Sequence, residues 1–372
     1  MHELSRRLVG TYEVHVVAPH FEGAALEEDM DGVRVHRFRY FHPGKKALVY
    51  DGGMLMNIQR HPWLLLSLPF FLLAQFSTAW CLARRHRVVL VHAHWVIPQG
   101  VVAWVLRLFY RRAPLVITSH GGDVYGLNGW LTGFVKRRVY RSSAAVTVVS
   151  RAMAEALSQQ LPGVDIRVAS MGVDLQETFV PQAPLEERRD MIFVGRLVDK
   201  KGVDVLLQAF ARVVASYPGL RLCIVGHGPL RESLESLVAQ LGIGEAVEFA
   251  GAVPNMQVPG LLNQHAIAVV PSVIAASGDQ EGLGLVGIEA MGCGCAVVAS
   301  DLPAIRDVVD GEKTGLLFES GNVSELAKSL GSLLEDDGLR LRLAENGRRN
   351  ALERFDWSIA AENYRKIFAR LV

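Results

Sequence analysis

The chain has 372 residues, of which 50% are hydrophobic and 21% charged, so its composition excludes a disordered protein and its length predicts two domains. The formal net charge of +1 excludes a global attraction to nucleic acid. The four cysteines form no C-x-x-C pair and three lie in apolar segments, which predicts reduced core thiols in a cytosolic protein.

The first half of the chain alternates apolar strands with helices. Its opening residues, MHELSRRLVG, lack the apolar stretch on which a signal peptide depends. Runs that are apolar throughout are typical of parallel strands buried on both faces by helices. Polar or glycine-rich residues follow these runs, at the edge where open α/β sheets bind ligands. The predicted strands cover residues 12–19, 88–94, 114–121 and 144–150.

Residues 63–83, WLLLSLPFFLLAQFSTAWCLA, are nearly long and apolar enough to span a bilayer. Pro69 and several polar residues interrupt this segment, and Arg84 and Arg85 follow it at once. We favour a helix packed on a sheet. A helix lying on a membrane surface is the second interpretation, and a transmembrane span is the third.

The alternation of strands and helices restarts in the second half of the chain. Residues 180–190, VPQAPLEERRD, hold two prolines and a charge run, which predict an exposed linker. We expect an α/β protein of two doubly wound, Rossmann-like domains that face each other across a cleft. The expected parts are an N-terminal domain (1–180), a linker (181–190), a second domain (191–355) and a C-terminal helix (356–372) that crosses back to the first domain.

The motif FVGRLVDKKG places Arg196 directly after a strand and Lys201 five residues later, ahead of a helix. Two cations and the free backbone N–H groups of a helix start suit a diphosphate. The alternative is a solvated surface turn, because Lys and Arg usually lie outside.

The motif EGLGLVGIE contains two acids eight positions apart, Glu281 and Glu289. Gly282 and Gly284 let the backbone approach a ligand closely, and their amides suit phosphate or sugar oxygens. The two acids could grip a metal, work as an acid–base pair, or hold sugar hydroxyls. The alternative is a helix cap with one buried, paired acid.

Together these motifs resemble the family-4 retaining glycosyltransferases, which have the GT-B fold. The spacing of Glu281 and Glu289 matches that family's E-x7-E signature. VHAHWVIPQG and TSHGGDVYG match the first domain of the family more loosely, so the resemblance covers nearly the whole chain. The segments that look like its second domain are GRLVDKKG, IVGHGPL, GDQEGLGLVGIEAMGCGCAVVAS and DGEKTGLLFESGN.

The resemblance implies a role for each residue of these motifs. Arg196 and Lys201 would bind the donor diphosphate and stabilise the leaving group. Glu281 would position the donor sugar, and Glu289 would bind the ribose. Fixed cations and helix N-termini can stabilise the leaving charge, so we expect neither a metal nor a cofactor.

The resemblance also implies backbone contacts and a partner from the first domain. The amides of Gly284 and Leu285 would contact phosphate or sugar, and the backbone near Val253 would meet the base. His120, at the tip of a strand, would face the donor sugar across the cleft.

Other polar motifs receive weaker interpretations. His92 and His94 are expected to be structural or on the acceptor side. Asp29-Met30-Asp31 has the D-x-D pattern of metal-dependent transferases, but it lies in a loop-like stretch and is interpreted as chance. GHGPLR has Arg231 where a dinucleotide fingerprint needs its third glycine, and it is expected to flank the donor nucleotide.

The start of the chain departs from the family pattern. Members usually open with a first strand and a Gly-rich loop, whereas MHELSRRLVG resembles the latter part of the first helix. The first strand of a doubly wound sheet is central, so we expect a truncated start. The alternative is a closed sheet in which residues 12–18 pair directly with 88–93.

The expected function is transfer of a sugar from a UDP- or GDP-sugar to a lipid-linked or polysaccharide acceptor in envelope or exopolysaccharide synthesis. The expected location is cytoplasmic, with peripheral contact at the inner face of the plasma membrane and no nucleic-acid partner. The alternatives are a GT-B epimerase or phosphorylase, and a non-catalytic protein that binds sugar nucleotides.

Overall fold

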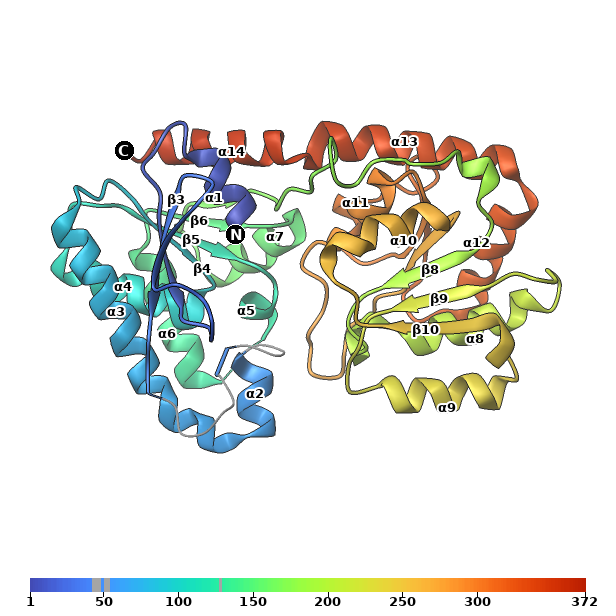
Figure 1. The fold of residues 1–372 in the computed structure, drawn as a ribbon, viewed down its shortest axis with the longest axis horizontal. Helices are drawn as coiled ribbons and strands as arrows, with labels where there is room; N and C mark the ends of the chain where they lie inside the picture. Colours follow the sequence, from blue (N-terminus) through green and yellow to red (C-terminus); the bar gives the residue numbers. More distant parts are fainter. Residues whose placement is uncertain (42–47, 50–53, 127–128) are drawn as a thin grey trace.

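The computed structural model describes residues 1–41, 48–49, 54–126 and 129–372, which form two α/β domains (Figure 1). The second domain is built on one parallel sheet of six strands in the order β10-β9-β8-β11-β12-β13. The order reverses between the neighbours β8 and β11, and open α/β sheets bind ligands at such a switch point. The strand bounds are β8 Met191–Val194, β9 Leu222–Val225, β10 Val247–Gly251, β11 Ile267–Val270, β12 Ala296–Ser300 and β13 Leu316–Phe318.

The first domain contains two separate sheets. A parallel sheet has the order β4-β5-β6-β7, and in the other sheet β3 pairs in parallel with β1 and antiparallel with β2. The alternative in which residues 12–18 pair directly with 88–93 is therefore wrong, because β1 pairs with β3 and β4 pairs with β5. The strand bounds are β1 His15–Pro19, β2 Glu27–Met30, β3 Val33–Phe38, β4 Val91–His94, β5 Leu115–Ser119, β6 Ala145–Val148 and β7 Ile166–Val168.

Amphipathic helices cover the sheets. In α8, for example, the buried residues Val203, Leu206, Leu207 and Phe210 recur at the spacing that puts them on one face of a helix. The helices are α1 His2–Leu8, α2 Met54–Arg60, α3 Leu68–Arg85, α4 Val101–Phe109, α5 Gly122–Tyr125, α6 Trp130–Ser142, α7 Arg151–Gln160, α8 Val203–Val214, α9 Arg231–Leu241, α10 Val258–Gln264, α11 Leu285–Gly292, α12 Val323–Glu335, α13 Asp337–Phe355 and α14 Trp357–Ala369. Short helical turns lie at Pro62–Ser67, Val96–Gly100, Leu185–Glu187, Asp199–Lys201, Gly244–Ala246, Asn255–Gln257 and Ile305–Asp307.

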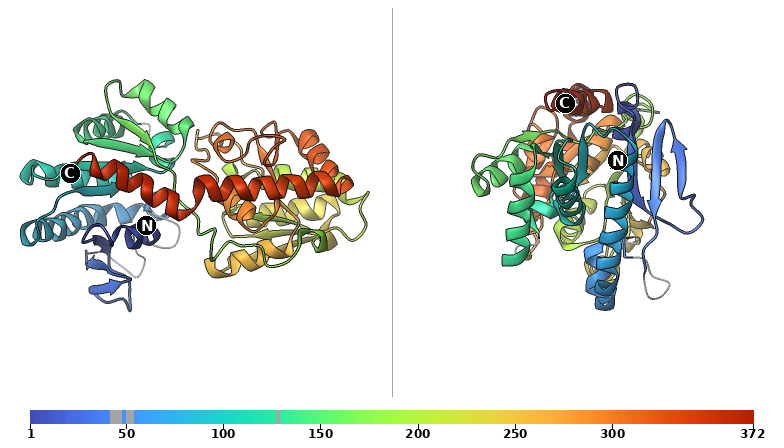
Figure 2. Two further views of the ribbon diagram at one scale, coloured as in Figure 1. Left: turned by 90° about the horizontal axis from the view of Figure 1, so that it is seen from above. Right: turned by 90° about the vertical axis from the view of Figure 1, so that its left-hand side faces the viewer.

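The chain crosses between the domains twice, and the two crossings are hydrogen-bonded to each other. Figures 1 and 2 show α13 lying along the second domain and α14 continuing along the first. Between these helices, Asp356 accepts a hydrogen bond from Leu175 N and caps α14 by accepting from Ser358 N. Trp357 and Tyr364 of α14 are buried in one cluster with Leu4 of the first domain.

Part of the segment predicted as an exposed linker is buried. Leu185 and Arg188 have exposed fractions of only 8% and 4%. The Arg188 guanidinium donates to Cys293 O at 2.9 Å and to Asn263 Oδ1 at 3.1 Å. The charge run predicts an exposed arginine. Arg188 is buried instead, because its acceptors lie 75 and 105 positions away in the chain and a sequence pattern does not show them.

The apolar segment 63–83 forms the turn Pro62–Ser67 and α3, which packs against β1, β3 and α4. Among the described residues, Pro62–Arg85 is the one helix that is long and apolar enough to cross a membrane, and only 22% of its apolar window is buried. One face of α3 therefore packs on a sheet, as the favoured interpretation predicted, and its other face is exposed.

Candidate functional site

The turn after β8 carries the two predicted diphosphate-binding cations. Arg196 is exposed, and Lys201 ends the helical turn Asp199–Lys201, directly before α8. Close packing fixes the shape of this turn. Leu197 N donates to His227 O at 3.0 Å, and a Cβ on Gly226 would lie 1.8 Å from Gly195 O. The glycines of GHGPLR thus let one loop pack against another.

Lys201 meets the second motif across the switch point. Its Nζ lies 2.5 Å from Glu281 Oε1, with only 18% and 11% of the two side chains exposed. The neighbouring Lys200 pairs instead with Asp279, at 3.1 Å. Val273 N, in the loop after β11, donates to Lys200 O at 2.9 Å and ties the two loops together. The structure therefore brings a cation and an acid 80 positions apart into one partly buried pair.

The second acid has different surroundings. Glu289 lies within α11, and burial raises its pKa to about 7, although the charge of Lys201 acts in the opposite direction. Gly284 precedes α11 in the left-handed conformation, with φ 83°, which glycine adopts without strain. Leu285 opens the helix and is 37% exposed. Val253 follows β10, two strands from β8, and packs against the hydrophobic core.

His120 lies at the carboxyl end of β5 in the first domain. Its backbone N donates to Asp123 Oδ1 at 2.9 Å, and its Nε2 is 2.9 Å from His94 Nδ1. The His94 and His120 rings stack with centroids 5.2 Å apart, and Trp95 packs on His120 at the same centroid distance. Burial lowers the pKa of both histidines, so both imidazoles are neutral at pH 7.

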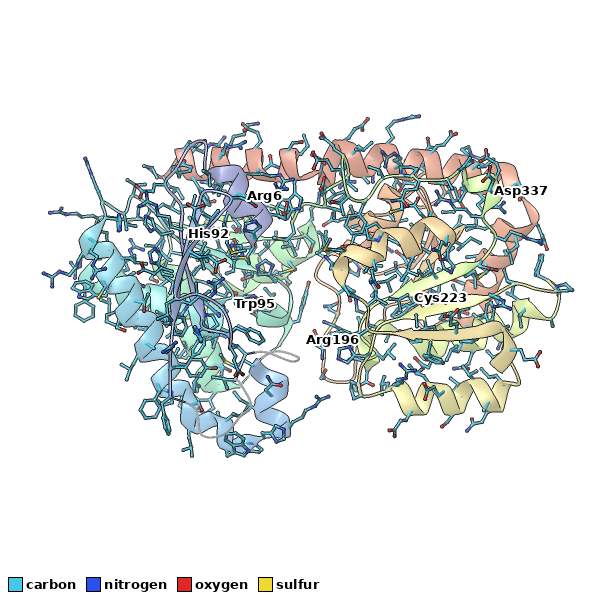
Figure 3. The ribbon with its side chains drawn as sticks, in the orientation of Figure 1. Arg6, His92, Trp95, Arg196, Cys223 and Asp337 are labelled. Carbon is cyan, nitrogen blue, oxygen red and sulfur yellow. The ribbon has the colours of Figure 1, made fainter. Side chains whose placement is uncertain are left out.

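The two halves of the site touch through their glycines. A Cβ on Gly282 would lie 2.9 Å from His120 O, and one on Gly121 would lie 3.2 Å from Gly282 Cα. Figure 3 shows Trp95 and Arg196 on the facing sides of the two domains. The loop that follows Glu281 therefore lies directly against the loop that carries His120.

Trp95 joins this cluster without having been predicted. His94, expected to be structural or on the acceptor side, packs on His120, and its role remains a prediction. The positions of the two histidines could have predicted their contact, because His94 ends β4 and His120 follows the neighbouring strand β5. Asp123 supports both loops, since it accepts hydrogen bonds from Val96 N and His120 N.

His92 adjoins the cluster, with its ring centroid 4.2 Å from that of His94, whereas the D-x-D motif belongs to a different sheet. His92 bonds Thr118 Oγ1 at 2.6 Å and packs against Phe368 of α14, as a structural residue would. Asp29 lies near the end of β2, where its Oδ1 accepts a hydrogen bond from Gly32 N at 2.7 Å in the turn to β3.

One group of metal-ligand type was found within the described residues: Glu13, His15 and His86. These residues lie before or at the amino ends of β1 and β4, whereas the cluster around Lys201 and His120 lies at carboxyl ends of strands.

Comparison with known proteins places the chain among sugar transferases. The profile described as "Glycosyltransferase Family 4" matches residues 1–177, and "Glycosyl transferases group 1" matches 176–350. The chain is 30% identical over 312 residues to the D-inositol 3-phosphate glycosyltransferase of Corynebacterium jeikeium, covering 76% of this chain and 72% of that protein.

Two further proteins extend the comparison. The GDP-mannose-dependent alpha-(1-6)-phosphatidylinositol monomannoside mannosyltransferase of Mycolicibacterium smegmatis is 30% identical over 261 residues, which cover 65% of this chain and 66% of that protein. The sucrose-phosphate synthase of Thermosynechococcus elongatus has the same fold, with a TM-score of 0.80 at 24% identity over 99% of this chain and 92% of the other. The chain is therefore a glycosyltransferase of the group 1/family 4 type with the GT-B fold, acting on nucleotide-sugar donors.

Proposed function

We propose that this glycosyltransferase moves a hexose from a UDP- or GDP-sugar to a lipid-linked or polysaccharide acceptor in envelope or exopolysaccharide synthesis, with retention of the anomeric configuration. The observation that carries the proposal is the Lys201–Glu281 pair at the switch point, in the loop that packs against His120. The relative that uses GDP-mannose and a phosphatidylinositol acceptor supports this donor and acceptor chemistry over an epimerase or a non-catalytic protein.

The chemistry assigned to each residue follows from its charge and position. The bond between sugar and phosphate breaks, and the leaving nucleoside diphosphate gains negative charge. Lys201 and Arg196 would hold that charge at the start of α8, where free backbone N–H groups also point. Glu281 would exchange its contact with Lys201 for the sugar hydroxyls, and Glu289 would accept from the ribose diol. His120, neutral and oriented by His94 and Asp123, would face the sugar.

We further propose that no metal takes part, because the leaving charge would be held by protein cations and amides. The expected outcome is that EDTA leaves the rate of transfer unchanged. Loss of activity in EDTA, with recovery on adding Mg²⁺ or Mn²⁺, would overturn this part of the proposal.

Adjacent lysines provide a matched test of the diphosphate assignment. Lys201→Ala is expected to reduce turnover by about 10²–10³-fold, the usual effect of losing one charge contact made in a transition state. Lys200→Ala removes the same charge one position away, from a pair with Asp279, and should change turnover by less than about threefold. Donor hydrolysis would be followed against a panel of UDP-, GDP- and ADP-sugars, with thermal unfolding of each variant as the check on folding. Equal rates for the two variants would contradict the proposal.

A further inference from the structure

The charges of this nearly neutral protein are unevenly distributed along the chain. Residues 52–154 contain twelve of the 39 Lys and Arg residues but only one of the 38 Asp and Glu residues, Asp123. Asp123 is 2% exposed and is engaged with the backbone N–H groups of Val96 and His120. The surface of this segment therefore carries cations that no exposed acid of the same segment offsets.

Four of these cations gather around one hollow. Between α4 and α6 lies an open cavity of about 400 Å³ whose walls include Trp104 and Leu108. Within the described ranges of the chain, none of its arginines forms an ion pair with an acid. Guanidinium groups bind phosphate through paired N–H donors, so such a cluster suits an anionic phosphate group. The arginines are Arg107, Arg111, Arg138 and Arg141.

Apolar side chains are exposed on the same helices. Trp130 and Phe134 of α6 are 86% and 66% exposed, and Phe109 of α4 is 65% exposed. On α3, Trp80 packs against Phe109 and lies 5.9 Å beneath the Arg84 guanidinium. Contacts join α3 to α4 and α4 to α6, and Figure 2 shows the three helices side by side on the end of the molecule away from the second domain. We call this surface the outer face.

We propose that the outer face docks on a bilayer of anionic phospholipids, with the four arginines around lipid phosphates and the exposed aromatic residues among the headgroups and upper acyl chains. Aromatic and basic side chains presented together are typical of surfaces that lie on such bilayers. Nucleic acid fits less well, because a phosphate backbone gives the exposed Phe109 and Phe134 no apolar surface to contact. The inference deepens the proposed function, since it rests on the lipid-linked acceptor proposed there, while docking itself needs no turnover.

Co-sedimentation of the full chain with vesicles tests the proposal. We expect binding to vesicles of phosphatidylcholine with 30% phosphatidylserine, and at least tenfold weaker binding to phosphatidylcholine alone. A basic residue near an anionic bilayer contributes about fivefold in affinity, so Arg138→Gln/Arg141→Gln should weaken binding by about 25-fold. Trp130→Ser/Phe134→Ser should also weaken vesicle binding. Because this loss is apolar, its size should be the same at low and high salt.

A charge-matched control comes from the second domain. Arg342 and Arg349 are exposed on α13, so Arg342→Gln/Arg349→Gln removes the same charge far from the outer face and should leave vesicle binding unchanged. Equal losses in the two double variants would overturn the proposal. The proposal would also be overturned if the wild-type protein bound vesicles equally well with and without phosphatidylserine, or if it bound a DNA duplex more tightly than vesicles.

The failure of docking and the failure of the proposed function have different signatures. Hydrolysis of the nucleotide sugar by water, measured without vesicles, reports the donor site alone and should be the same in all these double variants. Hydrolysis without vesicle binding would sink the docking proposal and leave the transferase proposal standing. Vesicle binding without hydrolysis of any donor would do the reverse.

Discussion

Lys201 interacts with two acids that differ in their surroundings. It forms a 2.5 Å ion pair with Glu281, whereas Glu289 lies within α11, where burial raises its pKa to about 7. At neutral pH, Glu289 is therefore poised between a charged form, which accepts hydrogen bonds from a diol, and a neutral form, which burial favours. The sequence predicted both acids as a pair, but the spacing E-x7-E carries no information about which of them titrates.

The raised pKa of Glu289 predicts opposite effects of pH on stability and on donor binding. The ordinary pKa of a glutamate is 4.5, so between pH 4.5 and about 7 the unfolded chain has lost a proton that the folded protein keeps. The free energy of unfolding should therefore fall as pH rises through this window, by about 3–4 kcal/mol in total. Donor affinity should rise about tenfold from pH 6 to 8 as the carboxylate forms.

Glu289→Gln is the matching variant, because glutamine has a similar shape and does not titrate. It should lose this part of the pH dependence of stability, and its donor affinity should stay low and flat between pH 6 and 8. Urea unfolding and titration calorimetry at several pH values would measure the two quantities. A variant with the wild-type pH profile would show that another group titrates.

The turn of residues 195–202 owes its shape to the loop beside it. Gly226 has φ 137°, and a Cβ there would lie 1.8 Å from the Gly195 carbonyl oxygen. The predicted nucleotide-flanking role of GHGPLR remains a prediction. What the structure adds is that these glycines allow the turn with Arg196 and Lys201 to lie against β9.

Gly226→Ala should therefore disturb donor binding through the backbone. Gly219→Ala is the control, because Gly219 also has a positive φ, 83°, but a Cβ there meets nothing within 4 Å. Both variants place an alanine at a positive φ, which costs about 1–3 kcal/mol, and the cost is larger at Gly226, whose φ of 137° lies farther from the left-handed helical region. Gly226→Ala should lose about 1–3 kcal/mol more in urea unfolding because of the clash, and it should bind the donor more weakly. Equal stability and equal donor affinity of the two variants would mean that the loop accommodates the added Cβ without loss of free energy.

In the molecule as a whole, the proposed active site is complete only where the two domains meet. The Lys201–Glu281 pair belongs entirely to the second domain, whereas His120 belongs to the first, and Gly282 lies against the His120 carbonyl. The two crossings of the chain are tied together at Asp356, which bonds Leu175 and caps α14. Under the proposed function, we therefore expect donor binding and donor positioning to be separable, since only positioning would depend on the contact between domains.

Gly282→Ala is expected to separate these two properties. A Cβ at this position would lie 2.9 Å from His120 O and would push the domains apart. Turnover should fall about 10–100-fold, because small displacements of reacting groups are costly, while donor affinity changes less than about threefold. Gly260→Ala, in a helix of the same domain with nothing within 4 Å of the new Cβ, should match wild type in both. Steady-state kinetics and calorimetry would decide, and an equal loss of affinity and turnover would argue against this division.

The local elements and the motifs could be predicted from the amino-acid sequence. Periodicity and apolar runs predicted the strands that became β1, β4, β5 and β6, because alternation and burial of this kind are properties of neighbouring residues. The family resemblance, confirmed by the comparisons, added the GT-B fold.

Features that depend on residues far apart in the chain became visible only in the folded protein. Two sheets in the first domain, the burial of Arg188, the pairing of Lys201 with Glu281 and the stacking of His94 on His120 all follow from such contacts. The sequence does not show whether a charged residue contacts water or an acid 80 positions away. Its burial is set by the packing of whole helices and strands.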